Sequence, residues 1–128
     1  MSQFFTSGGQ ITGTSASTPL TDFDSVIYEK AVRFMTENIE KNLSVHEISS
    51  HCNVGETFLK LTFKKYSGES VHKFFLSLKM RYATEMLKNG HSVTEVSMNL
   101  GFCSQPYFSS AFKREFGISP TDLQRKRS

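Results

Sequence analysis

The stretch Ser44-Val45-His46-Glu47-Ile48-Ser49 returns 48 residues later as Ser92-Val93-Thr94-Glu95-Val96-Ser97. A second match, between Phe63-Lys64-Lys65 and Phe112-Lys113-Arg114, has an offset of 49, and each copy is followed by a Gly-x-Ser. One residue has therefore been added between the two matches, around the turn of each copy, where an insertion costs least. The chain contains an internal repeat, and the repeated unit decides the fold.

Each copy opens with a capping box, Ser44-x-x-Glu47 or Ser92-x-x-Glu95. The serine accepts from a free N–H of the first turn, and the glutamate accepts from the amide of the serine, so a helix starts at each place. We expect these short helices to end near Cys52-Asn53 and Leu100-Gly101. After a turn, second helices are predicted at about 56–66 and 105–116, each ending at a glycine. Two helix-turn-helix units therefore span about 44–67 and 92–117.

A long helix is predicted between the two units, from Val71, capped by Ser70, to Lys88. Eighteen residues at 1.5 Å each give a rod of roughly 27 Å. Successive major-groove segments of a DNA duplex lie about 34 Å apart, so the rod can present two helices to one DNA face if the DNA bends or one helix seats less well. The residues expected on its apolar side are Val71, Phe74, Phe75, Leu78, Tyr82, Met86 and Leu87.

Outside the repeat, apolar residues at three-to-four spacing predict a helix from about Asp24 to Lys41, with Asp24 or Ser25 as its cap. A short helix is expected to start at Pro120. Residues 1–23 are rich in Ser, Thr and Gly and are predicted to form a flexible tail or linker. No segment alternates as a strand does, so the predicted class is all-α, with the folded domain over residues 24–128.

Composition suits one small domain: 128 residues, 38% of them hydrophobic. No apolar run is long enough to cross a membrane and no export signal is visible, so we expect a cytoplasmic protein that does not contact membranes. Residues 1–59 carry three Lys or Arg against seven Asp or Glu, and residues 60–128 carry twelve against five. This concentration of positive charge in the second half suits a polyanionic partner such as nucleic acid.

Catalytic and metal-binding motifs are missing from the sequence. Cys52 and Cys103 are interpreted as small apolar packing residues rather than a disulfide pair. The four histidines do not place two ligands one helical turn apart beside a third, and no phosphate loop or nucleophile elbow is present. We therefore expect no metal, no cofactor and no enzymatic activity.

The second unit and its flanks read Gly101-Phe102-x-x-Gln105-x-Tyr107-Phe108-x-x-x-Phe112-Lys113-Arg114-x-Phe116-Gly117-Ile118-x-Pro120. With Leu43-Ser44-Val45 and Phe63-Lys64-Lys65 upstream, this pattern resembles the C-terminal DNA-binding domain of AraC/XylS-type transcription regulators, from about residue 25 to residue 125. The resemblance implies seven helices, two helix-turn-helix subdomains, binding of a monomeric domain to double-stranded promoter DNA, and contact with RNA polymerase.

The second helix of each unit is the expected recognition helix, with its phenylalanines in the core and its other face toward DNA. Lys60 can donate to guanine, Gln105 can pair with adenine, and the cations late in each helix suit phosphates. The N-termini of the short first helices, at Val45-His46 and Val93-Thr94, can also direct N–H groups at phosphate. The candidate DNA-binding residues are Thr57, Lys60, Leu61, Lys64, Lys65, Gln105, Pro106, Ser109, Ser110, Lys113 and Arg114.

Four positions depart from the family pattern. Leu61 stands where an arginine is common, with Thr62 at a usually apolar place beside it, and Pro106 and Ser110 replace longer polar residues. An outward Leu61 is suited to thymine methyl groups, which favours a T-rich half-site, although it also fits a stray surface apolar residue. The missing arginine leaves an alternative open: a protein-interaction module that keeps the fold and has lost specific DNA affinity.

Overall fold

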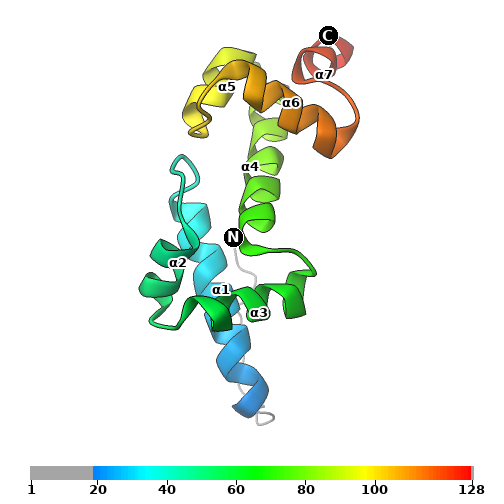
Figure 1. Ribbon diagram of the computed structural model, residues 1–128. Coiled ribbons are helices and arrows are strands. Elements are labelled where there is room, and N and C mark those ends of the chain that lie inside the picture. The colour runs from blue at the N-terminus through cyan, green and yellow to red at the C-terminus, as the bar shows by residue number, and fades with distance from the viewer. Residues whose placement is uncertain (1–18, 128) are drawn as a thin grey trace.

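The computed structural model describes residues 19–127, which form seven α-helices, as expected for the all-α class. The predicted tail lies outside the described residues as far as residue 18. Figure 1 shows two lobes at the two ends of one long helix, α4. The helices are α1 (Pro19–Glu37), α2 (Val45–Cys52), α3 (Glu56–Ser67), α4 (Val71–Lys88), α5 (Val93–Asn99), α6 (Gln105–Phe116) and α7 (Pro120–Arg127).

Both predicted capping boxes are present. The hydroxyl oxygens of Ser44 and Ser92 each accept from the backbone N–H of the third helical residue, a glutamate. The backbone N–H of each serine donates in turn to the carboxylate of that glutamate. The turns also correspond, because Asn53 (φ 60°) and Gly101 (φ 76°) both adopt the left-handed conformation. The next residue of each turn donates to the same carbonyl position, Val54 to Ser49 and Phe102 to Ser97. The offset of 48 therefore holds through Phe102, and Cys103 is the added residue.

The observed α4 has the predicted bounds, but its buried face differs from the prediction. At 100° per residue, Val71, Phe74, Phe75 and Leu78 lie on one side, whereas Met80, Ala83 and Leu87 lie roughly 160° round the helix. The first set belongs to the core of α1–α3 and the second to the core of α5–α7. Tyr82 continues the first face beyond the end of that core, so it is exposed. Met86 is only partly buried.

Helix α1 begins at Pro19 and ends at Glu37, so both predicted ends were wrong. Proline is tolerated in the first turn of a helix because its missing N–H has no partner there, and no polar cap at Asp24 is needed. The Asn38 side chain donates to the Phe34 carbonyl, and residues 38–44 form a loop in place of the expected last turn. The predicted domain start at residue 24 therefore falls inside α1, which packs against α2 and α3.

Two further interpretations are settled by burial. Cys52 is buried in the first core, as expected, but Cys103 is exposed because it occupies the added position of the turn rather than a helix face. Thr62 is buried, and its hydroxyl donates to the Phe58 carbonyl one turn earlier, so its polar group is satisfied inside an apolar core.

Candidate nucleic-acid interface

Helix α3 divides into a buried side and an exposed side. Leu59, Thr62 and Phe63 are buried, with Phe63 edge-on to Phe74 of α4 at a ring separation of 5.2 Å. The opposite side carries Leu61, which is 65% exposed, an unusual position for a large apolar side chain. The predicted residues that lie exposed on this side are Thr57, Lys60, Leu61 and Lys64.

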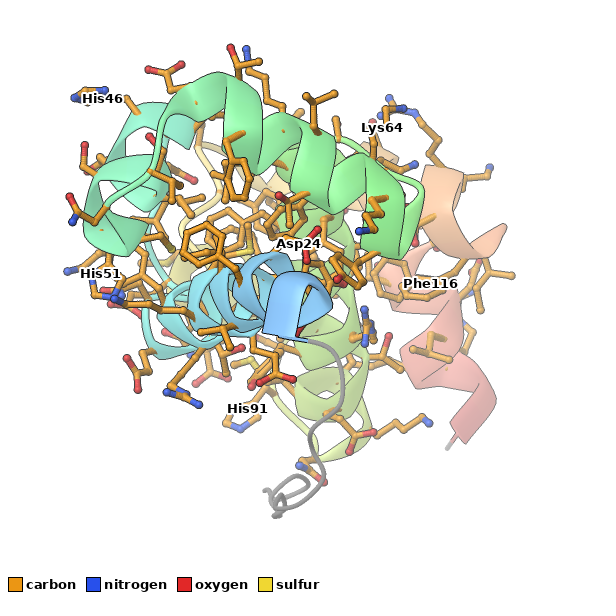
Figure 2. All side chains as sticks on the ribbon, turned by 90° about the horizontal axis from the view of Figure 1, so that it is seen from below. Asp24, His46, His51, Lys64, His91 and Phe116 are labelled. Atoms are coloured by element: carbon orange, nitrogen blue, oxygen red, sulfur yellow. The ribbon has the colours of Figure 1, made fainter. Side chains whose placement is uncertain are left out.

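Figure 2 views the first lobe along α1. The labelled His46 and Lys64 lie along the outer edge of α2 and α3, and Asp24 lies on the opposite side of α3, toward α1. The outer edge is therefore a polar surface that α1 leaves uncovered. Lys64 and Lys65 are adjacent in sequence, but the ammonium of Lys65 contacts Asp24 of α1.

Lys65 is held by α1. Its ammonium donates to Asp24 Oδ2 at 2.8 Å, and the Tyr66 hydroxyl donates to Asp24 Oδ1 at 2.9 Å. The hydrogen bond to Asp24 raises the pKa of Lys65, and the same bond, with that from Tyr66, holds the pKa of Asp24 below its usual value. Lys65 therefore already neutralises a carboxylate, whereas Lys64, Lys113 and Arg114 have no ion pair with another described residue.

Replacing Asp24 by asparagine is expected to remove part of the acid sensitivity of folding. A carboxyl whose pKa is lowered in the folded state contributes stability at neutral pH, and this contribution is lost as pH falls below about 4 toward the lowered value. Melting temperatures measured from neutral to acid pH should therefore fall less steeply in Asp24→Asn than in the wild type. Glu29→Gln on the same helix is the control, and equal slopes in all three proteins would contradict the prediction.

Helix α6 has the same division into two sides. Phe108, Ala111 and Phe112 are buried, and the Phe108 ring lies 5.0 Å from that of Phe102 in the preceding turn. Ser104 caps the helix by accepting from the Tyr107 amide. Ser109 is half-buried, and the predicted residues that are exposed are Gln105, Pro106, Ser110, Lys113 and Arg114.

In both units a side chain of the short first helix contacts the first residue of the following helix, α3 or α6. In the second unit the Thr94 hydroxyl donates to Gln105 Oε1 at 2.7 Å. In the first unit His46 Nδ1 lies 3.2 Å from Glu56 Oε2. His46 corresponds to Thr94 at the offset of 48, and Glu56 to Gln105 at 49. Sequence reasoning missed His46, Glu56 and Thr94 as side chains of this surface, although the repeat register already paired them.

The described part of the chain holds no group of three or more side chains arranged as metal ligands. No helix in residues 19–127 combines the length and the apolar character needed to cross a bilayer. Basic side chains lie in the last turns of α3 and α6: Lys64 and Lys65 in α3, and Lys113 and Arg114 in α6.

Residues 48–126 match a family described as a helix-turn-helix domain. The chain is 33% identical over 99 residues to the HTH-type transcriptional regulator ArgR of Pseudomonas aeruginosa, covering 77% of this chain and 30% of that protein. It is also 33% identical over 95 residues to the HTH-type transcriptional regulator GbdR of the same species, covering 73% and 26%. The chain thus spans less than a third of the length of either relative.

Among solved structures, the chain is similar to a transcriptional regulator from Chromobacterium violaceum described as having an AraC-type DNA-binding domain. The two share 30% identity with a TM-score of 0.77, over 84% of this chain and 96% of the other. The C-terminal domain of AraT, a response regulator from Geobacillus stearothermophilus, has the same fold, with a TM-score of 0.74 at 24% identity over 88% of each chain.

Proposed function

Since the chain belongs to the family of AraC-type helix-turn-helix transcriptional regulators, whose members bind DNA, we propose that it reads promoter DNA through α3 and α6, in two neighbouring major-groove segments. The observation that carries the proposal is the exposed polar side of both helices. Figure 1 shows α3 and α6 at opposite ends of α4, each following its short first helix in the same left-to-right direction. Two equivalent surfaces held by one rod suit two half-sites of one duplex.

We assign base contacts to the first half of each recognition helix, where a helix entering the groove comes closest to base edges. In α3 these are Thr57, Lys60 and Leu61. In α6 they are Gln105, with Pro106, Ser109 and Ser110 beside it. The bond from Thr94 leaves one lone pair of Gln105 Oε1 and its amide N–H groups for the N6 and N7 edge of an adenine.

Phosphate contacts are assigned to the cations in the second half of each helix: Lys64, Lys65, Lys113 and Arg114. Contacts of this kind position the protein without reading sequence. Lys65 must first exchange Asp24 for a phosphate, so its contribution should be smaller than that of Lys64. The roughly 27 Å length of α4 against the 34 Å groove repeat favours DNA that bends toward the protein.

The bound domain is proposed to be a monomer, since two half-sites are read by one chain. Contact with RNA polymerase is a further proposal, made on the family relationship alone.

Selection of bound duplexes from a random pool tests the assignment. The wild-type domain should select two half-sites about one helical turn, 10–10.5 base pairs, apart. Lys60→Ala should relax preference in one half-site and Gln105→Ala in the other, each by about 1–3 kcal/mol at the affected position. Lys30→Ala, on the exposed side of α1, is the control and should leave both unchanged. Relaxation of the same half-site by both substitutions would refute the assignment.

The same selection tests Leu61. An exposed leucine on the groove side suits the methyl group of thymine, so the half-site of α3 is expected to be T-rich. A half-site anchored by guanine there would overturn this preference.

A further inference from the structure

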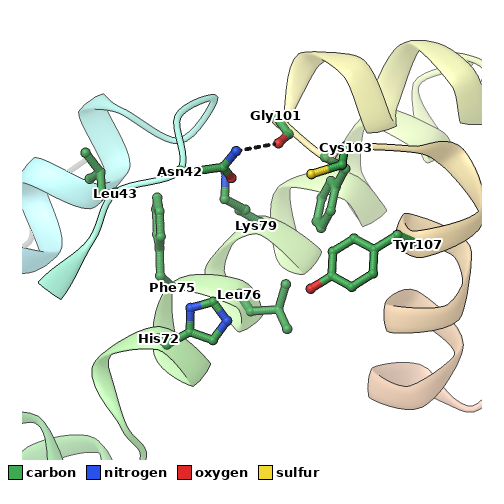
Figure 3. A pocket seen from close by; sticks show the side chains of 10 residues that line it. Asn42, Leu43, His72, Phe75, Leu76, Lys79, Gly101, Cys103 and Tyr107 are labelled. Atoms are coloured by element: carbon green, nitrogen blue, oxygen red, sulfur yellow. Dashed lines mark hydrogen bonds between the residues drawn. The ribbon is translucent and has the colours of Figure 1, made fainter.

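A buried lysine lies where the two lobes meet. Lys79, in the middle of α4, is 4% exposed. Its ammonium donates to the carbonyls of Ile39 at 2.6 Å, Lys41 at 2.8 Å and Leu100 at 2.6 Å. Three bonds use all three of its protons. Figure 3 shows the side chain rising from α4 between the loop at Asn42 and the turn at Gly101.

The three carbonyls come from both lobes. Ile39 and Lys41 belong to the loop that leads from α1 to α2, whereas Leu100 is the C-cap residue that follows α5. At 100° per residue Lys79 lies about midway between the two faces of α4 that carry the separate cores. Lys79 thus lies at the seam between the lobes, where the loop that follows α1 meets the turn that follows α5. Its single side chain reaches both helix-turn-helix units there.

Burying the Lys79 ammonium costs desolvation free energy, so the contacts that it makes must offset that cost. Desolvation lowers the pKa of Lys79 to about 8, with the nearby Glu40 acting in the opposite direction. An apolar side chain here would avoid that cost but would leave three carbonyls without their donor. The rings of Phe75 and Phe102 flank the ammonium at 4.7 Å and 5.8 Å, and contribute cation–π attraction from both lobes.

Other contacts at the seam join the same two segments. The Asn42 side chain donates to the Gly101 carbonyl at 3.0 Å. Gly101 has φ +76°, and a Cβ there would overlap the Glu40 carbonyl oxygen, so the turn and the loop approach each other as closely as glycine permits. Ile39 packs at the margin of both cores.

Apolar packing at the junction is incomplete. A solvent-open pocket of about 520 Å³ lies beside the ammonium, and Phe102 is among the residues that line it. Figure 3 shows Leu43 and Phe75 on one side of this pocket and Tyr107 on the other. Among the described residues, only Ile39 belongs to the margins of both apolar cores, so apolar packing contributes little to holding the lobes in one orientation. The hydrogen bonds of Lys79 and Asn42 link the two lobes directly.

We propose that Lys79 is a specificity-determining positioning residue: its ammonium holds the two helix-turn-helix units in one relative orientation and thereby sets the half-site spacing that the domain accepts. The proposal rests on the proposed reading of DNA by both units. Inserting one base pair between half-sites moves the second by about 3.4 Å and turns it by about 34–36°. A domain whose units are locked together rejects such a change, and one whose units pivot tolerates it.

The first test uses the protein without DNA. Spin labels at Arg33→Cys in α1 and Asn99→Cys in α5, both exposed sites, are placed in a Cys103→Ser background, leaving Cys52 buried. Pulsed electron–electron double resonance then gives the distribution of distances between the two labels, and so between the lobes. Lys79→Met should broaden that distribution at least twofold, Lys79→Arg should keep it narrow, and Lys73→Met, exposed on the same helix, should leave it unchanged. An unbroadened distribution in Lys79→Met would overturn the proposal that Lys79 holds the two units in one orientation.

The second test uses DNA duplexes whose selected half-sites are separated by the preferred spacing or by one base pair more. The wild type should discriminate between them at least tenfold. Lys79→Met should reduce this ratio at least fivefold while leaving preference within each half-site intact, and Lys79→Arg should restore it. Loss of affinity for both duplexes in equal proportion would show a merely structural role and overturn the proposal.

Failure of the two proposals can be told apart. If the wild type shows no sequence-specific DNA binding, the proposed function is refuted. The distances between the spin labels still test whether Lys79 holds the two units in one orientation. If Lys79→Met is unfolded by circular dichroism, Asn42→Ala replaces it, because Asn42 is exposed and joins the same loop and turn. That variant should broaden the distances and lower the spacing ratio about twofold, and no change in either would count against the proposal.

Discussion

Raising the salt concentration from about 50 mM to about 200 mM is expected to weaken DNA binding by about 100-fold. Each neutralised phosphate contributes a slope of about −0.9 to log K against log salt, and four contacts over a fourfold change give about two decades. The four cations are those proposed to contact phosphate, in the last turns of α3 and α6: Lys64, Lys65, Lys113 and Arg114.

The adjacent pair Lys64 and Lys65 sharpens this prediction. Lys64→Ala should reduce the slope by about 1, because the Lys64 ammonium has no ion pair within residues 19–127 that must break before it contacts a phosphate. Lys65→Ala should reduce it by less, since Lys65 already holds Asp24 at 2.8 Å. Titration of a labelled duplex at four salt concentrations measures each slope, with Lys30→Ala on α1 as the control.

The alternative function is decided by the same titration. A protein-interaction module that has lost specific DNA affinity would bind the selected duplex no better than a scrambled one and would show no stepwise change of slope in the lysine variants. If the slope of log K against log salt is the same in the wild type, Lys64→Ala and Lys113→Ala, neither lysine contacts a DNA phosphate.

The helix boundaries that the sequence predicts correctly are those with local chemical signals. Helix α4 runs from Val71 to Lys88 as predicted because Ser70 caps it, and α6 runs from Gln105 to Phe116 because Gly117 takes the left-handed conformation at its end. Both capping boxes are satisfied within four residues of chain, so no distant contact decides them. For α1 the polar residues interpreted as its cap, Asp24 and Ser25, lie inside the helix, and both predicted ends were wrong by several residues.

The spacing of apolar residues along the sequence did not predict which residues far apart in the chain are in contact. The sequence predicts a single apolar stripe for α4, whereas the two lobes pack on nearly opposite sides of it. The spacing of apolar residues did not single out Lys79, which lies between those sides. The Lys65–Asp24 pair joins residues 41 positions apart. The exposed residues of α3 and α6 could be predicted, because a helix that buries one face must expose the other, but the residues that orient them could not.

Replacing Phe108 by alanine is expected to destabilise the second lobe by about 3–5 kcal/mol while the first lobe stays folded. Phe108 is fully buried, and its ring lies 5.0 Å from Phe102 and 5.8 Å from Phe112. These rings belong to the core of α5–α7, and within the described part of the chain the core of α1–α3 shares only Ile39 with it, at the margin of each. The cavity left by the ring therefore has no counterpart in the first core.

Hydrogen exchange followed by NMR separates the two lobes. Amides of α5, α6 and α7 should lose protection in Phe108→Ala, whereas those of α1, α2 and α3 should keep it. Phe116→Ala, on the same helix but 42% exposed, should cost far less and serves as the matched control. Equal loss of protection in α1–α3 would show that the lobes unfold as one cooperative unit. Retained protection there predicts in turn that the variant still recognises the half-site of α3 alone, because the exposed side of α3 is held by the first core and needs nothing from the second.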